Sequence, residues 1–289
     1  MTVGRTASIH ARLLNLAKAR DEDFNLILTR YAIERFLYRL SLVPARDVYW
    51  LKGALLFDLW FDVPHRPTRD ADFLGFGSAD IGMLASTICE ICNVVVDDGM
   101  EFDPASITIE EIREEANYGG LRVRLVSRLG NARCTVQLDV GYGDAVTPGP
   151  EEEVYPTLLD DQPPPRLRVY PRATVAAEKL EAIVSLGMTN SRMKDYFDLR
   201  ALALEGVLDA RLLGDAIAAT FQRRGTAVPV DVPLGLSDEF ARDAAKRAQW
   251  KAFLGKNRLD APTLDAVIEE VRRFVTEPLK LARQRKGRS

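Results

Sequence analysis

Apolar residues recur with helical spacing over the first part of the chain, and this pattern predicts two N-terminal helices. We expect the first helix at residues 6–20 and the second at residues 21–42. Three consecutive acidic residues, 21–23, suit the positive N-terminal end of the second helix, and Pro44 helps to end it. The chain therefore begins with a helical segment, residues 1–44.

Short apolar runs separated by turn-forming residues follow, a pattern typical of strands that alternate with short helices. The expected elements are strands at 48–51, 70–76 and 94–96, a further strand that begins near Ile107, and helices at 54–60 and 78–93.

A β-hairpin is the clearest local pattern in the chain. Apolar residues alternate with arginines from Leu121 to Leu125, Gly130 and Asn131 form a turn, and residues 135–140 return. Because side chains alternate between the two faces of a strand, the arginines of the first strand should lie on its more exposed face.

Residues 144–165 interrupt the pattern with prolines, glycines and acids, so we place a domain boundary within this stretch, after residue 150. The elements expected beyond it are a short strand at 167–170 and helices at 173–186, 192–204, 209–223, 237–254 and 262–284. The prediction is a mixed α+β chain with N-terminal helices (1–44), a core built on a mixed sheet (45–150) and a mainly helical C-terminal domain (151–289).

The composition, 47% hydrophobic and 28% charged, is that of an ordinary globular protein. The net charge of −3 gives no overall nucleic-acid signature, so any polyanion site must be a local patch. Three cysteines are too few for a disulfide framework and favour a cytoplasmic location, and two histidines leave little material for zinc or histidine chemistry. No apolar stretch approaches the roughly 20 residues of a membrane span, so we expect no membrane partner.

Two aspartates interrupt an apolar strand pattern at a place where acids are unfavourable. Side chains two residues apart project from the same face of a strand, so Asp70 and Asp72 would lie together and repel each other. A divalent cation such as Mg²⁺ removes that conflict. Asp139, late in the returning hairpin strand, would complete a two-metal site if its strand neighbours that of the pair. The alternative is that Asp70 caps a strand and Asp139 ends one.

Positive charges close to these acids in the sequence are candidates for phosphate binding. Lys52 and Gly53 stand between a strand and the start of a helix, where backbone N–H groups can meet a phosphate. Arg66 and Arg69 come just before the acidic pair and suit triphosphate oxygens. Solvated loop residues are the alternative for both arginines.

A third cluster of charges lies on two helices predicted after the domain boundary. Lys179 lies beside the buried stripe of one helix, and Asp195 and Asp198 are one turn apart on the next. Arg192 and Lys194 have ion-pair spacing to these two acids. Exposed pairs of this kind stabilise a helix by only roughly 0.2–0.5 kcal/mol each, so stability gives little reason for so dense a cluster. A solvated charged face remains the alternative.

Basic residues on the hairpin and near the C-terminus are candidates for contact with RNA phosphates. The alternative is a solvated strand face and a disordered tail. The residues are Arg122, Arg124, Arg128, Arg133, Lys280, Arg283, Arg285, Lys286 and Arg288.

The order of the motifs resembles the AbiEii toxin family of nucleotidyltransferases, which includes the MenT toxins. The motifs are LKGALL, RPTRDADF, VQLDVGYGD and YPRATVAAEKLEAI followed by SRMKDYFDL, and they span about residues 48–204. The resemblance implies a core like that of DNA polymerase β, and transfer of a nucleoside monophosphate from an NTP with release of pyrophosphate. It also implies Mg²⁺ or Mn²⁺ as the metal, a tRNA 3′ end as the acceptor and a cognate antitoxin as a partner.

The resemblance also implies roles for the residues that match the motifs. Asp70 and Asp72 match the metal-binding pair, and Asp139 matches the third acid. Lys179 matches the lysine of the fourth motif, expected to contact nucleotide phosphate, and Asp198 matches the acid at the end of that motif, expected to be needed for activity. The further candidates for nucleotide binding are Lys52, Gly53, Arg66, Arg69, Arg192 and Lys194.

One motif departs from the family pattern. The family usually has Lys-Gly-Gly followed by Ser or Thr, and this chain has Lys52-Gly53-Ala54-Leu55. Leu55 has no hydroxyl group to donate to a phosphate. Three functions therefore stay open: a toxin that transfers NMP to RNA, an enzyme that transfers NMP to a protein or small molecule, and a non-catalytic binding protein that has kept the fold.

Overall fold

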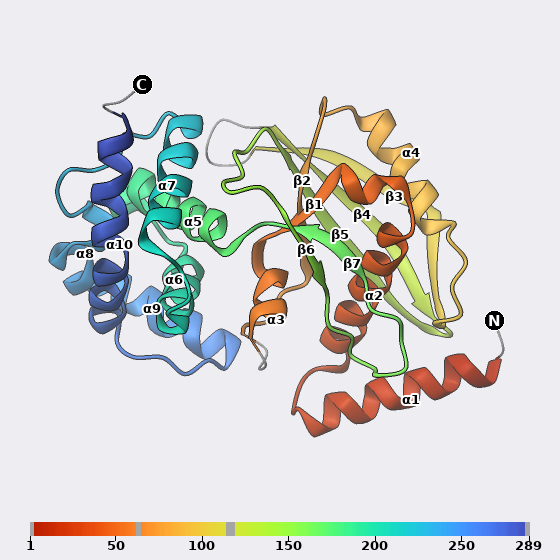
Figure 1. The fold of residues 1–289 in the computed structure, drawn as a ribbon. Coiled ribbons are helices and arrows are strands. Elements are labelled where there is room, and N and C mark those ends of the chain that lie inside the picture. The colour runs from red at the N-terminus through yellow and green to blue at the C-terminus, as the bar shows by residue number, and fades with distance from the viewer. Residues whose placement is uncertain (1–2, 62–64, 114–118, 287–289) are drawn as a thin grey trace. The chain divides into compact units, whose positions relative to one another are not determined.

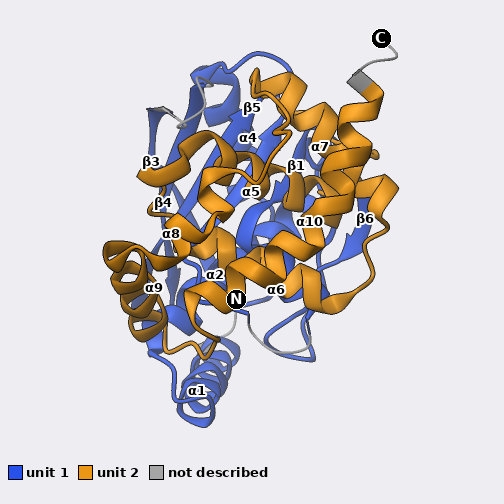
Figure 2. Cartoon of the chain, turned by 90° about the vertical axis from the view of Figure 1, so that its left-hand side faces the viewer, with its two compact units in different colours: residues 1–143, 151–169 blue, residues 144–150, 170–289 orange. Residues whose placement is uncertain are grey.

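The chain forms two compact units in the computed structural model, which describes residues 3–61, 65–113 and 119–286 (Figure 1). Unit 1 comprises residues 1–143 and 151–169, and unit 2 comprises residues 144–150 and 170–289 (Figure 2). Residues 151–169 belong with unit 1 because their two strands extend its sheet. Arg288, one of the basic candidates, lies outside the described residues.

Unit 1 is built on a seven-stranded mixed sheet with the strand order β3-β4-β5-β2-β1-β7-β6. Strand β2 pairs with β5 in parallel and with β1 in antiparallel orientation, and β1 pairs with β7 in parallel. The strands are β1 (Tyr49–Lys52), β2 (Asp70–Gly75), β3 (Met100–Arg113), β4 (Gly119–Leu129), β5 (Ala132–Tyr142), β6 (Glu151–Val154) and β7 (Arg166–Val169). The predicted mixed α+β class is confirmed.

The predicted hairpin is β4 and β5, and its alternation explains which side chains are buried. Leu121, Val123 and Leu125 are buried, whereas Arg122 and Arg124 between them are partly exposed. The β4–β5 register begins at the pair Leu129–Ala132, around the turn that the sequence predicted. The expected placement of the arginines on the more exposed face is confirmed.

The α-helices in the described part of unit 1 are α1 (Val3–Ala19), α2 (Phe24–Ser41), α3 (Leu56–Trp60) and α4 (Ile81–Cys92). Helix α2 begins at Phe24 rather than at the predicted residue 21, and Asp23, the last of the three expected acids, caps it by accepting a hydrogen bond from Leu26 N. Helix α2 packs on β5 and β7 with most of its residues buried (Figure 1). A buried ion pair joins it to the chain before β3: Arg39 Nη1 lies 2.6 Å from Asp98 Oδ2.

The described residues of unit 2 contain helices and no strand. The helices are α5 (Arg172–Leu186), α6 (Met193–Glu205), α7 (Ala210–Arg224), α8 (Asp238–Arg242), α9 (Ala244–Asn257) and α10 (Leu264–Lys286). Helix α5 ends at Gly187 and α6 at Gly206, both with positive φ, which confirms the predicted helix ends. In the described parts of both units, no helix is long and apolar enough to cross a membrane.

Three further predictions of elements or their bounds are wrong. Residues 94–96 form no strand: Val94 O accepts a hydrogen bond from the Arg39 side chain, Val95 is 95% exposed, and β3 begins at Met100 rather than near Ile107. The helix expected at 237–254 is two helices, because Asp243 ends α8 and its side chain caps α9 through the N–H group of Lys246.

Candidate active site

The acidic pair lies on β2, on one face of the sheet of unit 1. Asp70 and Asp72 are partly exposed, while Ala71 and Phe73, which point the other way, are 0% and 3% exposed. Thr68 Oγ1 donates a 2.6 Å hydrogen bond to Asp70 Oδ1. The two carboxylates therefore share one face of one strand, as the spacing predicted.

The third acid lies on the neighbouring strand. In the parallel pairing of β2 with β5, Asp72 is opposite Asp139 and Asp70 is opposite Gln137. Leu138 and Val140 are buried on the other face of β5, so Asp139 projects on the same side as the pair. The structure thus brings the strand positions of Asp70, Asp72 and Asp139 together, and we call these three residues the acid face.

An arginine that the sequence analysis placed among the candidates for RNA contact belongs to the acid face. Arg122 on β4 is opposite Asp139 on β5. Arg122 Nε donates to Asp139 Oδ1 over 2.8 Å, and Nη2 donates to Oδ2 over 2.7 Å. Hydrogen bonding to Asp139 raises the pKa of the Arg122 guanidinium above its ordinary value. Arg122 and Asp139 are equally far from the Gly130-Asn131 turn along the two strands. The hairpin pattern in the sequence therefore already predicts that these two residues are opposite each other.

The chemistry of the acid face fits a hard divalent cation, because carboxylate oxygens are the ligands that Mg²⁺ and Mn²⁺ prefer. In this conformation, however, no three His, Cys, Asp or Glu side chains among the described residues are gathered closely enough to hold a metal ion. Both carboxylate oxygens of Asp139 accept hydrogen bonds from Arg122. The backbone therefore places three metal-binding residue types side by side, and an arginine engages one of them.

The Lys52-Gly53 turn lies directly beside the acid face. Lys52, at the end of β1, is opposite Asp72 in the sheet and is 7% exposed. Gly53 has φ of +77°, and a Cβ atom there would collide with the carboxylate of Asp72. Leu55 is 2% exposed, so the position where the family usually has a hydroxyl is a core position here. The turn leads through a 3₁₀ turn into α3, which has only five residues.

The loop before β2 carries the two arginines expected to bind triphosphate. Arg66 is partly exposed and Arg69 is exposed. Both therefore have side-chain surface that a phosphate could reach.

The lysine–aspartate cluster lies within unit 2, on α5 and α6. Lys179 Nζ lies 3.0 Å from Asp195 Oδ1 and 2.6 Å from Asp198 Oδ2. Arg192 Nε lies 2.6 Å from Asp195 Oδ2. Both aspartate side chains are 0% exposed, while Lys194 is exposed. The alternative of a solvated charged face is therefore wrong for Asp195 and Asp198.

Asp195 joins the cations of this cluster, although the sequence pattern assigned it no role in the site. Burial by itself would raise the pKa of Asp195, but Lys179 and Arg192 outweigh burial and hold that pKa below its ordinary value. The ionised carboxylate fixes one cation on each of its oxygens. The spacing of Arg192, Asp195 and Asp198 gave the signal for a cluster, but only the packing of α5 against α6 shows that the acids are buried.

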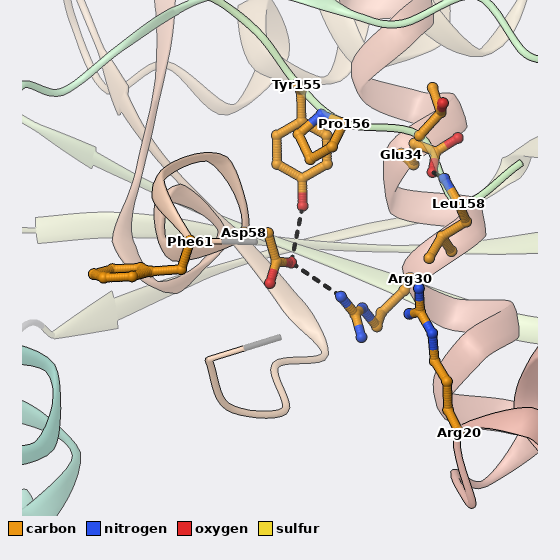
Figure 3. A pocket seen from close by; sticks show the side chains of 9 residues that line it. Arg20, Arg30, Glu34, Asp58, Phe61, Tyr155, Pro156 and Leu158 are labelled. Carbon is orange, nitrogen blue, oxygen red and sulfur yellow. Dashed lines mark hydrogen bonds and ion pairs between the residues drawn. The ribbon is translucent and has the colours of Figure 1, made fainter. Parts of the chain in front are cut away.

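A polar pocket of about 120 Å³ lies elsewhere in unit 1 (Figure 3). Asp58 accepts hydrogen bonds from Tyr155 Oη and Arg30 Nη2 in its wall. Glu34, which is 2% exposed, accepts a 2.6 Å hydrogen bond from Leu158 N through Oε2. Its Oε1 lies 2.6 Å from Arg35 Nη2 but has no hydrogen bond of good geometry. None of the predicted site residues lines this pocket, and its lining is Arg20, Arg30, Glu34, Asp58, Phe61, Tyr155, Pro156, Thr157 and Leu158.

Glu34 should make the stability of unit 1 depend on pH. Burial raises the pKa of Glu34 from 4.5 to about 7, against the opposing effects of Arg35 and the Leu158 N–H group. A raised carboxyl pKa means that folding favours the protonated form. The contribution of Glu34 to the free energy of unfolding is therefore fully present below pH 4.5 and is lost as pH rises towards about 7. We expect the stability of Glu34→Gln relative to the wild type to rise by about 3 kcal/mol across that window.

Urea unfolding of both proteins at a series of pH values measures this difference. The change in this stability difference across the pH series excludes any pH-independent cost of the substitution, because that cost is the same at every pH. A difference that does not change with pH would show that Glu34 keeps an ordinary pKa.

Two solved structures share the fold of this chain. MenT4, a nucleotidyltransferase toxin from Mycobacterium tuberculosis, is 19% identical with a TM-score of 0.55, and the match covers 96% of this chain and 98% of that one. JHP933 from Helicobacter pylori is 14% identical with a TM-score of 0.52, covering 91% and 95%. No curated protein matches the sequence. These two structural matches define the class of fold to which the chain belongs, and the acid face lies on the sheet of that fold.

The sequence itself shows the family to which the chain belongs. The family model described as "Nucleotidyl transferase AbiEii toxin, Type IV TA system" matches residues 35–275, most of the chain. The chain belongs to the AbiEii family of nucleotidyl transferase toxins, and the resemblance of its motifs to this family is confirmed. This family is one of toxin–antitoxin nucleotidyl transferases.

Proposed function

We propose that this protein transfers a nucleoside monophosphate from an NTP to an RNA acceptor, at the 3′ end of tRNA, with release of pyrophosphate. The observation that carries the proposal is the acid face, where Asp70 and Asp72 on β2 stand beside Asp139 on β5. Family membership supports the reaction class and an antitoxin as a partner. The acceptor rests on the resemblance to tRNA-modifying members of the family.

In the proposed reaction, the oxygen of an acceptor hydroxyl forms a bond to the α-phosphorus of the NTP. The bond from that phosphorus to the oxygen bridging to the β-phosphate breaks, and pyrophosphate leaves with that oxygen and its electron pair. The hydroxyl proton passes to a carboxylate oxygen of Asp139. Mg²⁺ or Mn²⁺, held by Asp70, Asp72 and Asp139, would neutralise phosphate charge and lower the pKa of the attacking hydroxyl.

The remaining candidates would position the phosphates, because phosphoryl transfer depends mainly on positioning and electrostatic stabilisation. In unit 1, Lys52 and the Gly53 backbone end β1 beside Asp72, and Arg66 and Arg69 supply positive charge from the loop before β2. In unit 2, Lys179, Arg192 and Lys194 are the candidates for nucleotide binding. Asp195 would position Lys179 and Arg192, and Asp198 would position Lys179.

The proposal is tested by incubating the protein with each α-³²P-labelled NTP in turn, with Mg²⁺ or Mn²⁺ and total tRNA. We expect one NTP to label RNA, and no label with the Asp72→Asn variant. Periodate-oxidised tRNA is the matched acceptor control, because oxidation destroys the 3′ terminal diol and leaves the rest of the RNA intact. Loss of label on oxidised tRNA supports the 3′ end as the acceptor.

Two other outcomes would contradict the proposal. Label on protein or on a small molecule from a cell extract, with none on RNA, would indicate a different acceptor class. No label with any NTP, under conditions in which a related enzyme is active, would favour a non-catalytic binding protein. The buried Leu55 in place of a phosphate-binding hydroxyl is the observation that favours this last function.

A further inference from the structure

Arg122, Asp139 and Asp72 lie at matching positions on three adjacent strands. Asp72 on β2 is opposite Asp139 on β5, which is opposite Arg122 on β4. The Asp139 side chain is 12% exposed and that of Arg122 is 29% exposed, so the pair is partly shielded from water. Two parallel hydrogen bonds of 2.8 Å and 2.7 Å use both carboxylate oxygens. This bidentate geometry is the strong form of an arginine–carboxylate pair.

The next arginine on the same face of β4 behaves differently. Arg124 is opposite Gln137 in the register with β5, and its Nη1 lies 2.8 Å from Glu110 Oε1 on β3, away from the acid face. That pair is 40% and 52% exposed. Two residues of identical chemistry, one step apart on one strand face, thus engage different partners. The contrast shows that the contact with Asp139 is specific to Arg122 and does not follow from positive charge on β4 alone.

A metal ion and the Arg122 guanidinium require the same atoms. A divalent cation bound at the acid face needs at least one carboxylate oxygen of Asp139, and in this conformation both oxygens accept hydrogen bonds from Arg122. Without a metal, Arg122 also offsets the repulsion among three neighbouring carboxylates. Each cation therefore lowers the affinity of Asp139 for the other, and the exchange is a two-state equilibrium.

We propose that Arg122 is an internal counter-ion that occupies both carboxylate oxygens of Asp139 until a divalent cation displaces it. This inference rests on the proposed metal-dependent function. It assigns Arg122 a regulatory part in metal loading, in place of the contact with RNA phosphate that the sequence suggested. The arginine acts through Asp139 and is not itself a metal ligand.

The test measures binding of Mn²⁺ alone to the full chain by titration calorimetry, before any NTP is added. We expect Arg122→Gln to bind Mn²⁺ about tenfold more tightly than the wild type, the effect of removing one good charge-assisted pair. Arg122→Lys keeps the charge but cannot grip both oxygens at once, so it should also bind Mn²⁺ more tightly, by a smaller factor. Arg124→Gln removes the same charge two residues along the strand and should leave the affinity unchanged.

Several results would overturn the inference. Unchanged or weaker Mn²⁺ binding by Arg122→Gln would show that the guanidinium does not compete with the metal. Equal tightening by Arg124→Gln, or wild-type affinity in Arg122→Lys, would show that overall charge is responsible. If the wild type and the Arg122 variants bind Mn²⁺ with the same affinity, the inference fails and the proposed function stands. If no protein binds Mn²⁺ with or without NTP, the metal-dependent function fails as well.

Discussion

Replacing Asp72 with Asn will lower nucleotidyl transfer by about a thousandfold or more, because Asn keeps the shape of the side chain but loses the charge that a divalent cation requires. Asp72 is the central residue of the acid face. It is opposite Asp139 on one neighbouring strand and Lys52 on the other, and its carboxylate packs against Gly53. The measurement is kcat/KM for transfer of α-³²P label to RNA.

Asp80→Asn is the matched control for this variant. Asp80 caps α4 by accepting a hydrogen bond from Met83 N, and Asn caps helices as well as Asp does. The control makes the same chemical change at an exposed position and should keep wild-type activity. Asp72→Asn protein that folds normally and retains more than about a tenth of the activity would contradict a metal-binding role, because one tenth corresponds to only about 1.4 kcal/mol.

Replacing Asp98 with Ala will cost unit 1 about 3–5 kcal/mol of stability, because it leaves the buried guanidinium of Arg39 without its counter-ion. The two side chains are 3% and 0% exposed, and Arg39 Nη2 lies 3.1 Å from Asp98 Oδ1 in addition to the 2.6 Å pair. Asp98 also accepts a hydrogen bond from Met100 N, which starts β3. Urea unfolding followed by circular dichroism measures the change.

Glu110→Ala serves as the comparison because it removes one partner of an exposed ion pair on the same sheet. Exposed pairs contribute roughly 0–1 kcal/mol, so this variant should unfold close to the wild type. If Asp98→Ala and Glu110→Ala have the same small effect, the Arg39–Asp98 pair does not hold α2 to the chain before β3.

Local pattern was sufficient for most of the fold. The hairpin around Gly130-Asn131 and the helix ends at Gly187 and Gly206 follow from periodicity and backbone chemistry that the sequence displays directly. The apolar run at 94–96 is too short to distinguish a strand from a loop by periodicity. The conformation of residues 94–96 depends on a residue distant in sequence, Arg39, whose side chain donates a hydrogen bond to the carbonyl of Val94.

The candidate site was predictable only where its residues are close in sequence. The shared face of Asp70 and Asp72 follows from strand geometry alone. The position of Asp139 beside them requires β2 and β5 to pair in parallel, and no local pattern specifies that long-range pairing. The hairpin turn predicts that Arg122 lies opposite Asp139. It does not predict the side-chain conformations that bring the two into hydrogen-bond contact.

The identity of the transferred phosphorus tests most directly whether the protein performs nucleotidyl transfer. Parallel reactions with α-³²P and γ-³²P forms of the same NTP, each with tRNA and Mg²⁺, distinguish the possible chemistries. We predict that label from the α-phosphorus enters RNA and that label from the γ-phosphorus is released as pyrophosphate. Label from the γ-phosphorus on the acceptor, or labelled inorganic phosphate as the released product, would contradict nucleotidyl transfer, because either result would show attack at a phosphorus other than the α-phosphorus.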